Sequence, residues 1–334
     1  MSPPVETTAT YARRGRDEMA NAKLDAGDLL KQPGHRGQSA EARGASKAPS
    51  LRLLPEARPA SGESPVSVAL GGLMTQRVYN GNFMEMAPSL PDKSVDIIIA
   101  DPPYNASKGG AWSVESGALP GIGGRWKKIS EVWDDMPLND YLAFTLRWLD
   151  EARRVLKQTG SMWVHGTYHN IGIINVAMQT LRIEIINEIV WYKRNSFPNL
   201  SGRRITASHE TILWAHRGGR RDYRFNYEQS KFGNYSDDRL KSPGRQMRTV
   251  WDIPNNKSRE ELAFGAHPAQ KPERLSRRLI QLSAQPGDVC LVPFAGSGSE
   301  CVGAHKEGLR FIGFETDENY VEISRRRLSA AGAP

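Results

Sequence analysis

The chain has 334 residues, of which 39% are hydrophobic and 25% are charged, enough for one large α/β domain with an insertion or for two modest domains. No stretch approaches about 18 consecutive apolar residues, which argues against a membrane span, and the first residues lack the pattern of a secretory signal. Two cysteines and seven scattered histidines form neither a disulfide framework nor a zinc-ligand pattern. We therefore expect a cytoplasmic protein, outside the membrane and without a bound metal.

The formal net charge of +8 suits a polyanionic partner but does not establish one. The position of the charge is more informative, because residues 217–248 hold nine lysines and arginines against four acidic residues. Aromatic side chains are interleaved with these basic residues, and apolar periodicity fails from about residue 217 to residue 265. Most of the excess positive charge that follows residue 73 therefore lies in one irregular segment.

The pattern of apolar residues divides the rest of the chain. Residues 1–73 are rich in Ala, Gly, Pro, Ser and charged residues, and are predicted to be mostly disordered. From Met74 onward, strands are expected at 77–79, 94–100, 161–165, 185–192, 210–215, 289–292 and 310–314, and helices at 141–156, 171–181, 273–283, 299–307 and 318–328. Strands separated by helices predict an α/β fold, a Rossmann-like and mainly parallel sheet with helices on both faces.

A candidate catalytic motif, Asp101-Pro102-Pro103-Tyr104, directly follows the strand expected at 94–100. In open α/β sheets, ligands bind beyond the carboxyl ends of strands. The prolines stiffen the turn, so a carboxylate and the Pro102 carbonyl could both accept hydrogen bonds from one amino group. Such acceptors draw the hydrogens of an aromatic amine out of the ring plane and make its nitrogen more nucleophilic. Tyr104 offers a flat face for stacking a base, whereas the alternative is a proline-rich strand exit without a role.

A candidate cofactor loop lies between the strand expected at 289–292 and the helix expected at 299–307. Gly296 and Gly298 permit a tight turn and a close approach of a ligand to the backbone. The loop has no third glycine at the dinucleotide spacing, and by itself it is equally typical of a plain turn. Glu315 ends the next strand, where a carboxylate can accept hydrogen bonds from ribose hydroxyls. The combination favours a nucleoside-containing cofactor.

A polar loop, His267-Pro268-Ala269-Gln270-Lys271-Pro272, leads into the helix expected at 273–283. Proline in the first turn is a common helix start, so the loop taken alone is typical of a polar helix entry. Its His, Gln and Lys side chains could also bind a carboxylate group of a cofactor.

Taken in order, these motifs resemble those of the amino-group DNA methyltransferases of the permuted β class, over about residues 76–328. In that family a (D/N/S)PP(Y/F/W) motif precedes the target-recognition region, and HPxQKP and FxGxG elements follow it. This chain has Asp101–Tyr104, the basic segment, His267–Pro272 and Phe294–Gly298 in the same order. The resemblance implies the fold of a class I S-adenosylmethionine-dependent methyltransferase.

The resemblance also implies a reaction, the transfer of a methyl group from S-adenosylmethionine to the N6 amino group of adenine in double-stranded DNA. Asp rather than Ser at position 101 favours this target over the N4 amino group of cytosine. The implied catalytic residues are Asp101, Pro102, Pro103 and Tyr104. The implied cofactor-binding residues are Asp101, His267, Gln270, Lys271, Phe294, Ala295, Gly296, Ser297, Gly298 and Glu315. The basic residues expected on DNA are Arg203, Arg204, Arg220, Arg221, Arg239, Lys241, Arg245 and Arg248.

In domain terms, the resemblance makes residues 74–216 the catalytic half, 217–265 an inserted target-recognition region and 266–330 the cofactor-binding half. Two features depart from the family. An acidic residue usually precedes the Pro-Phe of the cofactor loop, where this chain has Val292, so another group must replace it or cofactor affinity falls. Residues 106–132 separate the tetrapeptide from Trp133-Asp134 and could form a lid, contact the DNA backbone or have no role.

Other classes of function remain open at this point. A nucleotide-dependent oxidoreductase would account for the glycine loop and Glu315, but it leaves Asp101–Tyr104 without a role. A catalytically inactive DNA-binding module could use the same basic segment. Methylation of RNA or of a protein glutamine fits less well, because a basic and aromatic insertion suits the phosphates and bases of duplex DNA. A homodimer and a cognate restriction endonuclease are further partners consistent with the family.

Overall fold

The computed structural model describes residues 67–105, 136–196, 198, 202–265 and 267–334, and the backbone of residues 111–114 and 126–129. Contacts divide the chain into residues 1–51 and residues 52–334, and the fold below is that of the second unit. The arm predicted at 1–73 lies outside the described residues up to position 66. Its last part is ordered, because β1 (Ala69–Leu70) pairs with β2 (Leu73–Met74) and Leu73 is buried. The described fold therefore begins ahead of the boundary expected at Met74.

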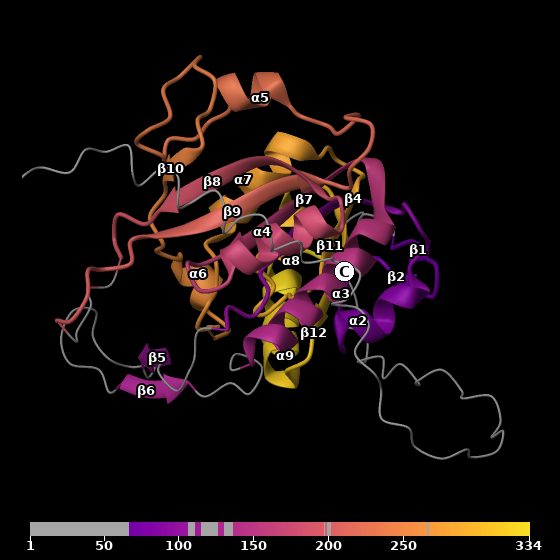
Figure 1. Cartoon of the computed structure of the whole chain (residues 1–334), viewed down its shortest axis with the longest axis horizontal. Coiled ribbons are helices and arrows are strands. Elements are labelled where there is room, and N and C mark those ends of the chain that lie inside the picture. Colours follow the sequence, from indigo (N-terminus) through magenta and orange to yellow (C-terminus); the bar gives the residue numbers. More distant parts are fainter. Residues whose placement is uncertain are drawn as a thin grey trace, which may run out of the picture. The chain divides into compact units, whose positions relative to one another are not determined.

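An eight-stranded sheet forms the core of this unit (Figure 1). In spatial order its strands are β10 (Val250–Asp252), β8 (Glu184–Tyr192), β9 (His209–His216), β7 (Leu156–Gly166), β4 (Val95–Ala100), β11 (Val289–Val292), β12 (Arg310–Glu315) and β3 (Arg77–Asn80). The five strands from β7 to β3 are parallel, β9 is antiparallel to both of its neighbours, and β10 is parallel to β8. The prediction of a mainly parallel sheet is confirmed, with β9 as the exception.

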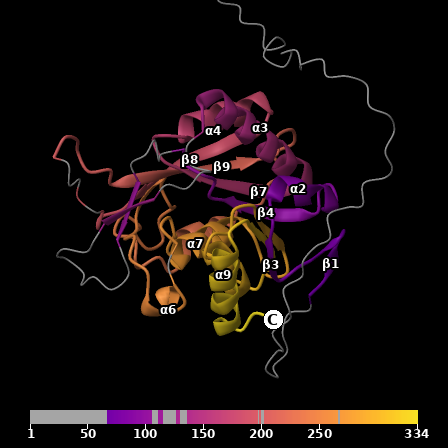
Figure 2. The same ribbon diagram turned by 90° about the horizontal axis from the view of Figure 1, so that it is seen from below.

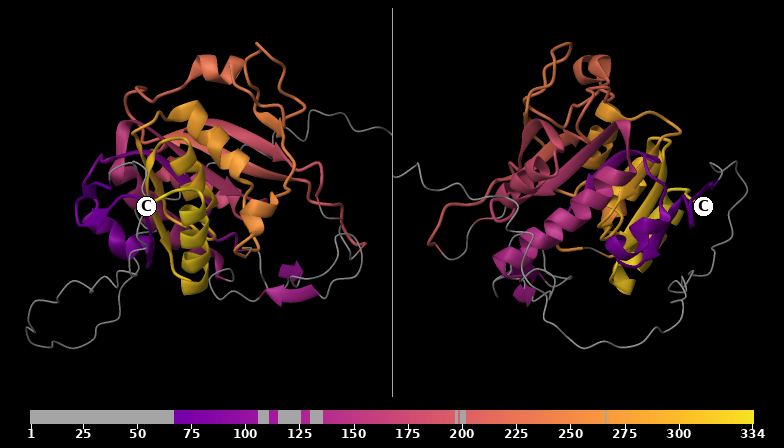
Figure 3. Two further views of the ribbon diagram at one scale, coloured as in Figure 1. Left: turned by 180° about the vertical axis from the view of Figure 1, so that it is seen from behind. Right: turned by 45° about the vertical axis from the view of Figure 1, so that its right-hand side comes forward.

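Helices cover both faces of the sheet (Figure 2). On one face lie α2 (Phe83–Met86), α3 (Leu138–Val155) and α4 (Ile171–Thr180), and on the other α7 (Glu273–Ser283), α8 (Ser299–Lys306) and α9 (Glu318–Ala330). The yellow helix α9 is seen from its solvent side in the left view of Figure 3. Side chains that alternate along the fully buried strand β4 explain both layers. Ile98 belongs to the core under Trp148 of α3, whereas Ile97 belongs to the core under Leu279 of α7.

The order of the connections defines a switch point in the middle of the sheet. β4 is followed through α3 by β7 on one side, and β11 is followed through α8 by β12 on the other. Because β4 and β11 are parallel neighbours, the loops that start at Asp101 and Pro293 leave the same edge of the sheet side by side. We name this edge, where β4, β7, β8 and β11 end, the carboxyl edge. Ligands of open α/β sheets bind at this kind of position.

The strands and helices expected from residue 77 onward are all present, although β7, expected at 161–165, already begins at Leu156. Elements without a sequence signal are β1, β2, α2, the 3-10 turn η1 (Ala87–Ser89), the hairpin of β5 (Ala111–Val114) and β6 (Trp126–Ile129), α5 (Tyr227–Phe232), α6 (Arg259–Leu262) and β10. The remainder of segment 106–132, and Trp133-Asp134, lie outside the described residues. Within the described ranges, no helix combines the length and apolarity that a membrane crossing requires.

Candidate active site

The tetrapeptide that follows β4 lies at the switch point. Both oxygens of the Asp101 carboxylate are engaged, since Oδ1 accepts a hydrogen bond from the Tyr104 hydroxyl at 2.6 Å and Oδ2 contacts Lys271 Nζ at 2.5 Å. Lys271 also lies 2.5 Å from the Tyr104 hydroxyl. Burial and the neighbouring carboxylates raise the pKa of Tyr104 well above its ordinary value, so its phenol stays protonated. The tetrapeptide therefore presents a carboxylate held in place from two sides.

Two polar side chains that carry no motif hold the turn itself. The Pro103 carbonyl accepts a hydrogen bond from the Tyr141 hydroxyl at 2.6 Å and another from Asn170 Nδ2 at 3.4 Å. Asn170 also donates to Tyr141 at 3.1 Å, and both residues are buried. Because they stand at the starts of α3 and α4, the helix layer fixes the orientation of the Pro102-Pro103 turn. Sequence patterns did not identify either residue, since each reads as part of a helix start.

Lys271 is the centre of a buried cluster of charges. Glu210 of β9 lies 3.7 Å from Lys271 and 2.8 Å from Lys193. Burial alone would raise the pKa of Glu210, but Lys271 and Lys193 lower it to about 2. Burial likewise opposes the charge of Lys271, but Asp101 and Glu210 outweigh it and raise the pKa of Lys271 above its ordinary value. Two ammonium groups thus neutralise two carboxylates in a site with little solvent.

His165, one residue from the end of β7, adds a neutral side chain to this region. It is fully buried, and neither ring nitrogen has a hydrogen-bond partner among the described residues. Burial lowers its pKa to about 4, so the imidazole is uncharged at neutral pH. His165 carries no sequence signal for the site, because it lies within an apolar strand pattern.

The glycine loop, Phe294–Gly298, leaves β11 beside the tetrapeptide. Gly296 has a φ of +50° and donates its N–H to Glu315 Oε2 at 2.8 Å. Gly298 has a φ of +80°, and a Cβ there would meet the Ser324 hydroxyl at 2.7 Å, so the turn requires glycine. Phe294 packs edge-on against Trp148 with ring centroids 5.4 Å apart. The loop is therefore a tight turn whose backbone is tied to the carboxylate at the end of β12.

The segment 267–271 connects the glycine loop to the tetrapeptide. The Gln270 side chain accepts a hydrogen bond from Ser297 at 3.0 Å, and the His267 ring lies next to Gly296. Burial lowers the pKa of His267 to about 4. From the same segment, Lys271 reaches Asp101. Motifs separated by about 190 positions in sequence thus lie together at the carboxyl edge, where Lys271 contacts the tetrapeptide and Gln270 contacts the glycine loop.

Val292, the departure from the family pattern, is fully buried in the apolar core under α7 and α8. A buried carboxylate stands instead in the first turn of α8, where Glu300 is 4% exposed and accepts a hydrogen bond from Ser276 at 3.3 Å. Burial, and then the charge of Asp101, raise the pKa of Glu300 to about 7. The Glu300 carboxyl group, in the helix that follows the glycine loop, therefore gains or loses a proton near neutral pH.

Replacing Glu300 with glutamine is expected to stabilise the fold in a pH-dependent manner. With its pKa raised from 4.5 to about 7, Glu300 destabilises the folded state above pH 7 and has no such effect below pH 4.5. Relative to the unaltered protein, the variant should gain about 2.5 kcal/mol more free energy of unfolding at pH 8 than at pH 5. Urea unfolding at both pH values measures this difference. Glu322→Gln, at a half-buried position of α9 where burial does not raise the pKa above its ordinary value, is the control. An equal effect of E300Q at both pH values would refute the assignment.

The basic residues expected on DNA do not share one surface. Arg203 and Arg204 are exposed in the loop between β8 and β9, at the carboxyl edge. Arg220 and Arg221 follow the end of β9 at the opposite edge of the sheet, where Arg221 pairs with Glu184. The topology therefore separates Arg220 and Arg221 from the tetrapeptide, and we leave them out of the DNA surface.

The second half of the basic segment is also heterogeneous. Lys241 Nζ donates to three backbone carbonyls at 2.8 Å, those of Lys231, Ser242 and Arg245, so its ammonium group holds the loop together. The side chains of Arg239, Arg245 and Arg248 are exposed. These three arginines remain candidates for contact with DNA, whereas Lys241 is engaged in the protein.

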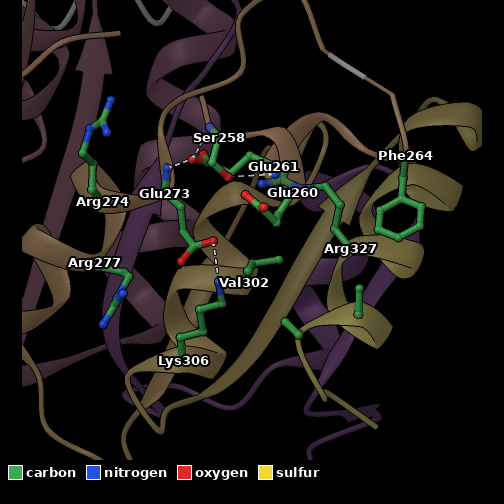
Figure 4. A pocket seen from close by; sticks show the side chains of 12 residues that line it. Ser258, Glu260, Glu261, Phe264, Glu273, Arg274, Arg277, Val302, Lys306 and Arg327 are labelled. Atoms are coloured by element: carbon green, nitrogen blue, oxygen red, sulfur yellow. Dashed lines mark hydrogen bonds and ion pairs between the residues drawn. The ribbon is translucent and has the colours of Figure 1, made fainter. Parts of the chain in front are cut away.

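A pocket of about 390 Å³ lies between α6, α7, α8 and α9 and does not include Asp101 (Figure 4). Its lining is charged, and Glu273 bridges to Lys306 at 2.9 Å across it. Arg327 also lines the pocket and donates to the Ser297 carbonyl at 2.7 Å, which supports the glycine loop from behind. The pocket is therefore separate from the tetrapeptide and touches the site through Arg327.

Comparison with known proteins identifies the class to which this fold and site belong. Residues 95–326 match the family model for N6/N4 methyltransferases, described as DNA methylase. The chain therefore belongs to this family of DNA methylases, and DNA is its substrate.

Individual relatives cover most of the chain. It is 38% identical to the type II methyltransferase M2.DpnII of Streptococcus pneumoniae over 269 residues, which are 78% of this chain and 95% of that protein. It is 33% identical to the type II methyltransferase M.HinfI of Haemophilus influenzae over 258 residues, 75% of this chain and 67% of that protein.

Solved structures share the fold. The PvuII DNA methyltransferase (cytosine-N4-specific) has a TM-score of 0.57 at 17% identity, covering 75% of this chain and 85% of its own. The M1.HpyAVI–SAM complex has a TM-score of 0.51 at 22% identity, covering 75% and 98%. The fold expected from the sequence, that of a class I methyltransferase, is confirmed.

Proposed function

We propose that this chain transfers a methyl group from S-adenosylmethionine to the N6 amino group of adenine in duplex DNA, at a specific site. The observation that carries the proposal is the junction at the carboxyl edge. There the Asp101 carboxylate lies beside the glycine loop, and segment 267–271 connects the two. An acceptor for an amino group and a turn suited to a nucleoside cofactor thus share one site.

The residues at the end of β11 and β12 fit this cofactor. The Glu315 carboxylate is fixed by the N–H groups of Gly296 and Asp317, and its remaining lone pairs are available to ribose hydroxyls. The turn at Gly296 and Gly298 lets a ligand approach the backbone closely. The rings of Phe294 and His267 line the same turn. These residues, with Ala295, Ser297 and Gln270, would hold S-adenosylmethionine.

The chain's own residues supply position and electrostatics for the reaction. S-adenosylmethionine, when bound, supplies a methyl group on a positively charged sulfur, which is already a strong electrophile. Asp101 and the Pro102 carbonyl accept hydrogen bonds from the target amine and direct its lone pair, and Tyr104 stacks on the base after it leaves the duplex. Tyr141 and Asn170 hold the turn so that both acceptors keep their places.

Further parts of the proposal concern the division of the chain and its partners. We assign residues 74–216 to the catalytic half, 266–330 to the cofactor half, and 217–265 to target recognition, although β10 within that last segment belongs to the main sheet. The type II names of the relatives support a cognate restriction endonuclease as a partner system. We also propose, from the family resemblance alone, that the chain forms a homodimer.

The test is to sequence modified bases in DNA from cells that express the chain and from cells that lack it. We expect N6-methyladenine at one recurring sequence only in the expressing cells. If N4-methylcytosine is found instead, the chain is still a DNA amino-methyltransferase, but its target base is cytosine and not adenine. Binding to DNA without any modification would favour the inactive DNA-binding module.

A further inference from the structure

One apolar side chain at the carboxyl edge is exposed to an unusual degree. Ile205, in the loop between β8 and β9, is 92% exposed, the highest value among the large hydrophobic side chains of the described residues. Two exposed arginines, Arg203 and Arg204, directly precede it. A single exposed apolar residue has no meaning by itself, so its position relative to the site decides its interpretation.

The base of this loop is joined to the catalytic tetrapeptide. Lys193 donates its backbone N–H to the Ser208 carbonyl at 2.7 Å and closes the loop, and its side chain pairs with Glu210 at 2.8 Å. The Tyr104 hydroxyl, which donates its proton to Asp101, lies 3.4 Å from Glu210 Oε2. The loop that presents Ile205 is therefore attached to the residue proposed to stack on the target base.

A second loop at the same edge supports the first. Arg204 donates to the hydroxyl of Tyr168, which follows β7, at 2.7 Å. Tyr168 is 61% exposed, and its ring lies 4.0 Å from that of His169. The loops after β7 and β8 thus form one projecting surface next to the tetrapeptide, with basic, aromatic and aliphatic groups together.

We propose that Ile205 is the wedge that enters the duplex when the target base leaves it. This inference rests on the proposed function, because only a base taken out of the stack leaves a gap to fill. Apolar side chains inserted between base steps are a recurrent means of opening a duplex, and arginines beside them contact phosphates. Ile205 stabilises the opened duplex, and Arg203 and Arg204 hold the strand at the mouth of the site.

The experiment compares Ile205→Ala with the unaltered protein on two duplexes that carry the site found by modified-base sequencing. In one duplex the target base is correctly paired, and in the other it is mispaired. A mispaired base needs less energy to leave the stack, so a wedge matters less there. We expect I205A to lose about 30-fold in kcat/KM on the paired duplex and to come within about threefold of the unaltered protein on the mispaired one.

Val176→Ala is the matched control, because Val176 is an aliphatic residue 57% exposed on α4, and its rates should not change on either duplex. Thermal unfolding of I205A checks that the fold is intact. An equal loss of kcat/KM on both duplexes, or no loss on either, would overturn the proposal that Ile205 acts as a wedge. If the unaltered protein methylates neither duplex, the proposed function itself fails, and the wedge fails with it.

Discussion

Replacing Asp101 with alanine is expected to lower the rate constant of methyl transfer by about a thousandfold or more, because positioned hydrogen-bonding groups at a reacting centre contribute effects of that size. The Asp101 carboxylate is fixed by Tyr104 and Lys271, so its loss removes an acceptor that no neighbour replaces in the same position. The measurement is single-turnover methyl transfer to DNA under saturating S-adenosylmethionine.

The same variant should keep its affinity for S-adenosylmethionine within about threefold, since Glu315 and the glycine turn lie on the neighbouring strands. Asp101→Asn, which keeps the shape of the side chain, is the conservative comparison and should also lose most of the activity. Near-normal turnover of either variant would refute the catalytic role of the tetrapeptide.

Replacing Lys271 with methionine is expected to have the second-largest effect, on activity and stability together. Lys271 lies between Asp101 and Glu210, and removing a buried partner leaves uncompensated charge, typically about 3–5 kcal/mol of lost stability. In the unaltered protein Glu210 has a pKa of about 2, so it stabilises the fold above pH 4.5 and loses that effect as the pH falls toward 2. Without Lys271, Lys193 remains to oppose the effect of burial, so the pKa of Glu210 should rise above its value in the unaltered protein. The variant should therefore lose most stability, relative to the unaltered protein, at high pH.

Urea unfolding between pH 3 and pH 8 measures this trend, because the contribution of Glu210 changes mainly below pH 4.5. Methyl transfer, measured in parallel at pH 8, should fall by at least about a hundredfold. Lys306→Met is the control, because Lys306 also pairs with a glutamate but stands at the pocket away from the tetrapeptide. A stability difference that is the same at every pH would contradict the account of Lys271 as the countercharge of the site.

Much of the fold could be predicted because its strands and helices have strong periodic patterns. Helix α7 and strand β11 have the bounds that their sequences predict, since apolar spacing and flanking prolines and glycines mark both ends. Short elements could not be predicted, because a few residues are too short to show a periodic pattern. β10 has three residues and depends on pairing with β8, a contact that no local pattern of residues 250–252 reveals.

The motifs of the site could be found from sequence because each follows a buried strand or precedes a helix, and the prediction of a DNA methyltransferase is confirmed by the family match. The contacts between the motifs could not be found. Lys271 was expected to bind the cofactor, and the sequence did not reveal that its ammonium also pairs with Asp101. Tyr141, Asn170 and Glu210 act through tertiary contacts, so no spacing along the chain marks them.

The basic segment shows how charge density in sequence can mislead. Residues 217–248 run from one edge of the sheet toward the other. Arg221 and Arg248 therefore belong to one basic segment of the sequence but lie near different edges of the sheet. By contrast, the loop that carries Arg203 and Arg204 has fewer charges but stands next to the site. The strand directions fix the edge of the sheet where each loop emerges, and so decide which arginines lie near the tetrapeptide.

Everything proposed for this chain depends on one nitrogen of a DNA base accepting a methyl group beside Asp101. The direct measurement is mass spectrometry of nucleosides from DNA incubated with the purified chain and S-adenosylmethionine that carries a deuterated methyl group. We predict labelled N6-methyldeoxyadenosine with the unaltered protein and none with D101A. Label on a carbon atom of a base, or an equal yield from D101A, would contradict the mechanism.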